Sequence, residues 1–291
     1  MKGWIVYPRY ISLHRDNAFG WMNDEAHKYG IELEVLFFEE LAPFYSAPGY
    51  CLLRNGKEIY EHPDFVILRG YDTALADHLE LLGIPVINSS VSSAAAKDKL
   101  LTCQLLAKEN INIPMTVGGM PEEWKYDMLC ELFNSSEFIV KRRDGAKGED
   151  VYLVNSEMEM AEAIKRCSGN CISQEFISES AGKDVRVWVI GSRAVACVMR
   201  YSDSSFRSNY CLGGKVAPYE LSSDVRNIAE KSTAVLGLEF AGVDLLLGKD
   251  GFLVCEVNAN AGFRTLSQVG GNDIPSQLFE YISARYGKLK N

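Results

Sequence analysis

A carboxylate inside an apolar run is the feature that most restricts how this chain can fold. Asp244 interrupts the run from Phe240 to Leu247. The next apolar run, Gly251 to Val257, contains Glu256 and leads into Asn258. A Lys-Asp-Gly turn between the runs predicts a β-hairpin. Residues two apart share one face of a strand, so the hairpin should bring Asp244 beside Glu256 and Asn258.

These three side chains offer the hard oxygen ligands that Mg²⁺ prefers, and Mn²⁺ is an alternative ion. The competing interpretation is a lone Asp at a strand end and an unrelated Glu-Asn pair at a turn. Burying carboxylates among apolar strands without a cation is costly, which favours the metal site. We therefore predict that Asp244, Glu256 and Asn258 bind Mg²⁺ together with phosphate groups and water.

Residues 1–88 are predicted to form a small parallel α/β domain, because short apolar strands alternate with helical patterns. The predicted strands are Gly3 to Tyr7, Ile31 to Phe38, Phe65 to Leu68 and Pro85 to Ile87. The predicted helices are Asp16 to Tyr29 and Thr73 to Leu82, each stopped by a glycine.

Two further units are predicted, at residues 89–177 and 178–291, in keeping with a chain of 291 residues that is 47% hydrophobic. The first should contain a helix at Lys97 to Asn110, strands at Phe138 to Lys141, Val151 to Val154 and Cys171 to Ile177, and a helix at Glu157 to Cys167. The second should contain an antiparallel sheet of Val185 to Ile190, Ala194 to Tyr201, Phe240 to Leu247 and Gly251 to Val257.

A phosphate-binding loop is indicated after the strand that ends at Lys141, where Gly145 and Gly148 follow. Glycine lets backbone N–H groups approach phosphate oxygens, and a lysine fixed on a strand supplies a positive charge. An ordinary glycine-containing loop is the alternative.

A nucleoside-binding segment is indicated at Gln174 to Ile177, which contains Glu175 and Phe176, and at Gly182 to Arg186, which contains Asp184. A strand between domains can offer backbone groups to an adenine edge and an acidic side chain to ribose hydroxyls. An ordinary strand and turn is the alternative.

A basic stretch follows, with Arg200, then Arg207, Ser208 and Asn209, and then Gly213-Gly214. Guanidinium groups match phosphate and carboxylate oxygens in bidentate geometry. A solvated loop with two arginines is the alternative.

The bulk properties exclude several classes of partner. The formal net charge is -9 and basic residues are interleaved with acidic ones, so nucleic-acid binding is not expected. No apolar run approaches the roughly 20 residues of a membrane span, and eight cysteines without a CxxC motif suit reduced thiols. We therefore predict a cytoplasmic protein that binds neither nucleic acid nor membrane; homo-oligomer formation is left open.

Taken in order, these segments resemble the ATP-grasp superfamily, and within it the RimK-like ligases, which include ribosomal-protein glutamate ligases and lysine-biosynthesis ligases. The order and spacing of several motifs carry the resemblance, which covers the chain from Asn88 to its end. The motifs are AAAKDKLLTCQLLAKENINIP, FIVKRRDGAKG, SQEFI with KDVRVWVIG, SFRSNYCLGG, and AGVDLL with EVNANAGF.

The resemblance implies an N-terminal α/β domain followed by a two-subdomain ATP-grasp fold of the α+β type, with ATP and Mg²⁺ as cofactors. For ATP it implies phosphate contacts from Lys99 and Lys141, a closing loop around Gly145 and Gly148, adenine contacts from Glu175 and Phe176, ribose contact from Asp184, and nucleotide and substrate phosphate contacts from Arg207, Ser208 and Asn209. For Mg²⁺ it implies Asp244, Glu256 and Asn258.

The implied reaction joins a carboxylate to an amine through an acyl phosphate and releases ADP. The expected product is an amino acid, glutamate or similar, added to a peptide, protein or small molecule. Arg200, Arg207 and Asn209 are the candidates for stabilising the reacting groups. The alternatives are a ligase of D-alanine-D-alanine or peptide-macrocyclising type, and a catalytically inactive ATP-binding regulatory protein.

Two segments depart from the family pattern. Glu149-Asp150 stands where relatives usually carry a small apolar residue and another glycine, which affects loop closure. The NANAGF segment lacks the proline that many relatives have before the last glycine, which affects the acceptor site.

Overall fold

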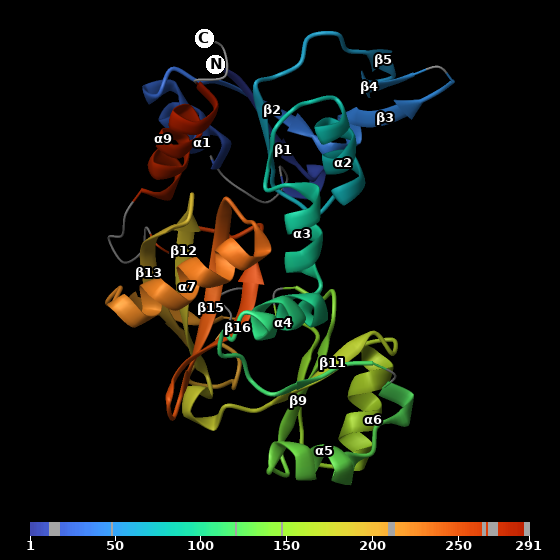
Figure 1. Ribbon diagram of the computed structural model, residues 1–291, viewed down its shortest axis with the longest axis vertical. Coiled ribbons are helices and arrows are strands. Elements are labelled where there is room, and N and C mark those ends of the chain that lie inside the picture. The colour runs from blue at the N-terminus through green and yellow to red at the C-terminus, as the bar shows by residue number, and fades with distance from the viewer. Residues whose placement is uncertain are drawn as a thin grey trace.

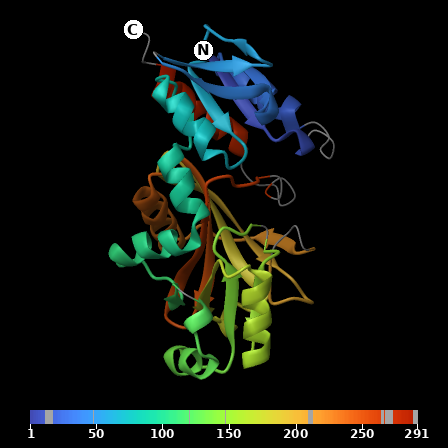
Figure 2. The same ribbon diagram turned by 90° about the vertical axis from the view of Figure 1, so that its right-hand side faces the viewer.

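The computed structural model describes residues 1–11, 18–47, 49–119, 121–146, 148–208, 213–263, 266 and 273–287. Three larger sheets follow one another along the long axis of the molecule, as Figure 1 shows: a parallel N-terminal sheet, a five-stranded sheet and a four-stranded sheet. Figure 2 shows the same succession from the side. The predicted fold class, α/β with an α+β part, is confirmed.

The N-terminal sheet has the strand order β2-β1-β6-β7 and is parallel throughout. Five of the six β1 residues are buried, as expected for a parallel strand covered on both faces. Its strands are β1 (Lys2–Tyr7), β2 (Glu32–Phe37), β6 (Phe65–Leu68) and β7 (Val86–Ile87), and its helices are α1 (Ala18–Lys28) and α2 (Thr73–Leu81).

A small antiparallel sheet in the same region was not predicted. It consists of β3 (Leu41–Tyr45), β4 (Tyr50–Arg54) and β5 (Lys57–Glu58), and it extends away from the rest of the chain in Figure 1. The buried ring of His78 on α2 attaches it, because Nδ1 lies 3.0 Å from the Tyr45 hydroxyl and Nε2 2.9 Å from the Cys51 carbonyl.

The predicted helix from Lys97 to Asn110 is present with a later start, and a second helix before it was not predicted. The structure has α3 (Ser90–Lys97) and α4 (Lys99–Lys108), separated at Asp98, whose backbone is extended. The Asp98 carboxylate caps α4 by accepting hydrogen bonds from the first turn, so the same residue ends one helix and begins the next.

The four-stranded antiparallel sheet has the order β10-β9-β11-β8, and α5 and α6 pack against it. Helix α5 was not predicted. The elements are β8 (Thr116–Val117), α5 (Tyr126–Phe133), β9 (Phe138–Arg142), β10 (Val151–Val154), α6 (Glu157–Arg166) and β11 (Cys171–Glu175).

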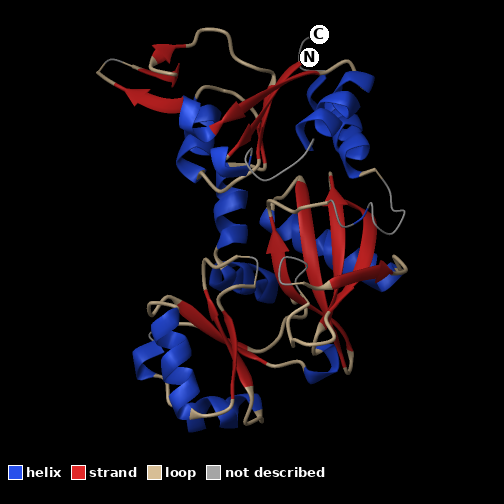
Figure 3. Ribbon diagram, turned by 180° about the vertical axis from the view of Figure 1, so that it is seen from behind, coloured by secondary structure: helices blue, strands red, loops and turns tan. Residues whose placement is uncertain are grey.

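The five-stranded antiparallel sheet has the order β14-β13-β12-β15-β16. Helix α7 packs on one face, while the C-terminal helix α9 packs beside α1, as the view from behind in Figure 3 also shows. The elements are β12 (Lys183–Ile190), β13 (Arg193–Tyr201), β14 (Lys215–Pro218), α7 (Ser223–Leu236), β15 (Phe240–Gly248), β16 (Gly251–Asn258) and α9 (Ile274–Tyr286). Helices α7 and α9 and strand β14 were not predicted, and the domain boundaries at residues 88 and 177 stay predictions.

Short 3-10 helices complete the described elements: η1 (Arg9–Ile11), η2 (Phe38–Glu40), η3 (Pro121–Glu123) and η4 (Ser178–Ser180). Within the ranges given above, no helix combines the length and the apolar character needed to cross a membrane. The seven cysteines that these ranges contain form no disulfide.

Candidate active site

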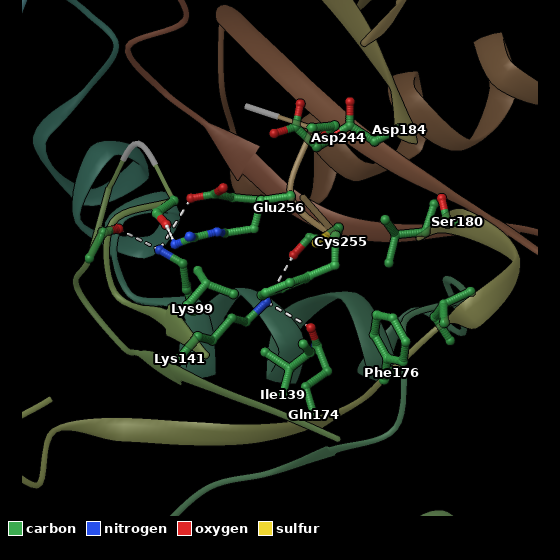
Figure 4. A pocket seen from close by; sticks show the side chains of 18 of the residues that line it. Lys99, Ile139, Lys141, Gln174, Phe176, Ser180, Asp184, Asp244, Cys255 and Glu256 are labelled. Carbon is green, nitrogen blue, oxygen red and sulfur yellow. Dashed lines mark hydrogen bonds and ion pairs between the residues drawn. The ribbon is translucent and has the colours of Figure 1, made fainter. Parts of the chain in front are cut away.

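One pocket lies between the four-stranded and the five-stranded sheets (Figure 4), and it collects residues from segments far apart in the sequence. Most of the predicted site residues line it: Lys99, Lys141, Gly145, Gly148, Glu175, Phe176, Asp184, Arg200, Arg207, Ser208, Asp244 and Glu256. Asn258 lies next to Asp244, and Asn209 falls outside the described residues.

Lys99 begins α4 and reaches into the pocket from one side. Its Nζ donates a 2.5 Å hydrogen bond to the Gly145 carbonyl and lies 3.2 Å from Glu256 Oε1. The Lys99 N–H also binds the Arg143 carbonyl at 3.0 Å, which holds the start of α4 against the glycine loop. The predicted phosphate lysine therefore already contacts both the loop and a predicted metal ligand.

Lys141 lies on β9 and is 4% exposed. Its Nζ donates to Gln174 Oε1 at 2.7 Å and to the Cys255 carbonyl at 3.5 Å, and both acceptors are neutral (Figure 4). Gln174 was not among the predicted site residues. Its place one residue before Glu175 on a pocket-edge strand was the signal that could have pointed to it.

Two ion pairs between neighbouring strands form the floor of the site. Asp184 lies opposite Arg200 in the β12–β13 pair and binds it at 2.7 and 2.5 Å. Asp244 lies opposite Arg186 in the β12–β15 pair and binds it through both carboxylate oxygens. Arg200 also lies 3.0 Å from Asp244 Oδ2, so the four groups make one continuous cluster.

The cluster favours the charged forms of Asp244 and Arg200. Burial by itself raises the pKa of Asp244, but Arg186 and Arg200 outweigh it and hold that pKa below the ordinary value. Burial lowers the pKa of Arg200, but Asp244 and Asp184 hold it above the ordinary value. Arg186 was missed as a functional candidate, and only the strand pairing identifies it.

The three residues predicted to bind Mg²⁺ lie at neighbouring positions of the β15–β16 hairpin. Asp244 and Glu256 are directly opposite each other on β15 and β16, and Asn258 Nδ2 lies 3.4 Å from Asp244 Oδ2. Among the described residues, no group of three or more His, Cys, Asp or Glu side chains could hold a metal by itself, so the set depends on the Asn258 amide. Because Arg186 and Lys99 now bind the two carboxylates, a metal would have to take over these contacts.

The predicted adenine segment lies at the pocket edge. Glu175 is engaged by Met115, since its N–H donates to the Met115 carbonyl at 2.9 Å and its Oε2 accepts from the Met115 N–H at 3.3 Å. The Phe176 ring packs edge-on against Phe206, with ring centroids 6.2 Å apart. These aromatic rings give that end of the pocket an apolar wall.

Arg207 links the two loops that border the pocket. It donates from Nη1 to the Gly148 carbonyl at 2.9 Å, and its guanidinium lies over the Phe206 ring, 5.4 Å from the centroid. Gly148 has φ +75°, a conformation that favours glycine. The buried Arg207 Nε has no partner within the described part of the chain, so one of its donors is left unsatisfied there.

Comparison with known proteins agrees with this geometry. The model of the RimK-like ATP-grasp domain matches residues 96–282. A probable alpha-L-glutamate ligase of Maridesulfovibrio salexigens is 32% identical over 226 residues, 76% of this chain and 75% of that protein. One of Xanthomonas campestris pv. campestris is 36% identical over 247 residues, 81% of this chain and 84% of that protein.

The solved structure of the ATP-grasp ligase PsnB with a minimal precursor, Mg and ADP has a TM-score of 0.71 at 21% identity, and the match covers 98% of each chain. Fold and comparisons together define an ATP-dependent ligase that forms carbon–nitrogen bonds. The chain belongs to the RimK-like ATP-grasp family.

Proposed function

We propose that the protein joins a carboxylate to the amine of glutamate or a similar amino acid through an acyl phosphate, using ATP and Mg²⁺. The acceptor in this proposal is a peptide, a protein or a small molecule. The observation that carries it is the 3.2 Å contact between Lys99 and Glu256. A cation suited to phosphate and a carboxylate suited to a metal lie side by side, as the binding of a metal–phosphate group requires.

The charges of the pocket support phosphate binding by Lys141 and Arg207. Within the described ranges neither side chain has an ion-pair partner, and both contact neutral carbonyl oxygens. Incoming phosphate oxygens would therefore meet uncompensated positive charge in a low-dielectric site, where such contacts are strong.

The donor set fits Mg²⁺, because Asp244, Glu256 and Asn258 can supply three oxygens next to Lys99. When bound, the ion would withdraw negative charge from the phosphate oxygens during transfer. Arg186 would then lose a partner, while Arg200 would keep Asp184.

The substrate carboxylate is a poor electrophile, and the proposed roles of Arg200 and Arg207 follow from that. A carboxylate repels an amine and has no good leaving group, so phosphorylation must come first, and amine attack then expels phosphate. In this proposal Arg207, whose Nε has no partner within the described residues, and Arg200, which lines the pocket, stabilise the oxygens that gain negative charge. The carbonyls of Gly145 and Gly148 accept hydrogen bonds from Lys99 and Arg207, so both glycines are joined to side chains of the pocket.

Glutamate as the added amino acid is supported by the names of the relatives at 32% and 36% identity. Asn209, the third catalytic candidate of the sequence analysis, stays a prediction outside the described residues.

The test is incubation of the purified protein with Mg-ATP, glutamate and pools of peptides or amino acids, followed by measurement of ADP and of product mass. We expect ADP and a mass gain of one glutamyl residue on one acceptor class. Lys141→Met serves as the inactive control. Absence of ADP with every pool would contradict a ligase and favour an ATP-binding protein without catalysis.

A further inference from the structure

We propose that Gln174 and Thr116 act as positioning residues that aim the Lys141 ammonium at the nucleotide phosphates. The inference rests on the proposed function, because it concerns how the ATP site is built. It assigns a role to Thr116, which the sequence analysis did not name, and to the side chain of Gln174, which was named only as the start of the nucleoside-binding segment.

The hydrogen bonds between these residues have only one consistent direction. Lys141 can only donate, so the Gln174 side chain must present Oε1 to it, at 2.7 Å. The amide nitrogen of Gln174 then points the other way and donates to Thr116 Oγ1 at 2.8 Å. The Thr116 hydroxyl donates in turn to the Pro114 carbonyl at 2.8 Å, so the series ends on a fixed backbone acceptor.

The strand pairing holds this series in place. Thr116 and Gln174 lie directly opposite each other in the β8–β11 pair, and Lys141 comes from the neighbouring strand β9. Gln174 is 3% exposed and Lys141 4% exposed, so water does not compete strongly for these bonds. Rotating the Gln174 amide by half a turn would bring its N–H groups toward the Lys141 ammonium, where two donors would face each other. It would also remove the hydrogen bond that the Gln174 amide nitrogen donates to Thr116.

The acceptor for Lys141 is the neutral amide oxygen of Gln174, which leaves the positive charge of the lysine uncompensated. A carboxylate in place of Gln174 would neutralise Lys141 and repel phosphate, whereas an amide oxygen orients the ammonium and leaves its charge intact. The other lysine predicted to bind phosphate, Lys99, is compensated by Glu256. Lys141 is thus the lysine held ready for phosphate, and Gln174 is what holds it.

The experiment measures binding of ADP, ATP and adenosine to the full-length protein by titration calorimetry, without any acceptor. For Gln174→Met we expect the Kd of ADP to rise roughly tenfold, from loss of a hydrogen bond to a charged group, with adenosine affinity unchanged. Gln174→Glu should raise the Kd of ADP at least as much. Thr116→Val should raise it about threefold, and Thr116→Ser, which keeps the hydroxyl, should restore wild-type binding.

Gln104→Met, at an exposed glutamine of α4, is the matched control, and thermal melting of each unliganded variant checks the fold. Equal losses of adenosine and ADP affinity would overturn the inference and make Gln174 an adenine contact. Wild-type ADP binding by Gln174→Met would also overturn it while leaving the proposed function intact. Failure of the wild-type protein to bind ADP or ATP would overturn both.

Discussion

Asn88 and Phe240 exchange two hydrogen bonds across the junction between the N-terminal sheet and β15. Asn88 Nδ2 donates to the Phe240 carbonyl at 2.7 Å, and Asn88 Oδ1 accepts from the Phe240 N–H at 2.9 Å. The same side chain binds the Glu239 N–H at 2.7 Å and the Ala259 carbonyl at 2.8 Å. One buried amide thus joins the start of β15 to the segment just after β16, the two strands that carry the predicted metal ligands.

Replacement of Asn88 by Asp should destabilise the protein. A carboxylate can accept from the two N–H groups but cannot donate to the Phe240 and Ala259 carbonyls, which would then face a buried negative charge. We expect the free energy of unfolding to fall by about 3 kcal/mol, measured by urea denaturation. Asn155→Asp, at an exposed position, should change it by less than about 0.5 kcal/mol. Equal stability of the two variants would contradict this role.

Replacement of Glu256 by Gln should weaken the dependence of ADP release on Mg²⁺. The change removes one charged ligand from the predicted set while keeping the size of the side chain. We expect the Mg²⁺ concentration for half-maximal rate to rise roughly tenfold or more. The exposed Glu131→Gln variant should match the wild type. An unchanged Mg²⁺ dependence in Glu256→Gln would count against the ligand set.

Replacement of Arg207 by Ala should lower turnover far more than ATP affinity. The buried Nε, free of partners within the described residues, is suited to charge that appears during the reaction, and loss of such a donor typically costs about a hundredfold in rate. Turnover comes from ADP release and affinity from calorimetry. Arg193→Ala, at an exposed arginine of β13, is the control. Wild-type turnover in Arg207→Ala would refute the assignment.

The ion pair of Asp98 with Arg143 should make stability depend on pH. Burial raises the pKa of Asp98, but hydrogen bonds from Arg143 and the α4 backbone outweigh it and hold that pKa below the ordinary 3.8. Since the folded-state pKa is the lower one, the stabilisation is present above about pH 4 and is lost as the pH falls through the folded-state value.

Asp98→Asn keeps a capping side chain but loses the charge. The Arg143 side chain is 40% exposed, so solvent screening limits the expected loss to about 1 kcal/mol at pH 7. The difference from wild type, measured by urea denaturation, should shrink as the pH falls below about 4 and through the folded-state pKa of Asp98. Asp77→Asn, at an exposed position of α2, should show no such trend. A constant difference across this range would rule out the ion pair as the cause.

Elements with strong periodicity and clear stop residues were predictable from sequence, including β6, β10 and the hairpin that carries Asp244 and Glu256. Helix α7 and the sheet β3-β4-β5 were missed. The sequence does carry a helical pattern for α7, because Val225, Ala229 and Leu236 are buried at helical spacing between the N-cap Ser222 and Gly237, but two polar residues, Ser232 and Thr233, interrupt the apolar side. The sheet β3-β4-β5 is small and largely exposed. The break at Asp98 was missed because the helical pattern continues on both sides of it. Asp98 is both the C-cap of α3 and the N-cap of α4.

The sequence by itself determined the fold class, the hairpin that opposes two carboxylates, and the lysine and glycine residues that border the pocket, because side-chain alternation and turn chemistry are local properties. Only the tertiary structure decided the partners: Lys99 with Glu256, Arg186 with Asp244, Asn88 with Phe240, and Gln174 between Lys141 and Thr116. These pairs join segments 33 to 157 residues apart. Such contacts follow from how sheets and helices pack, and no local pattern encodes them.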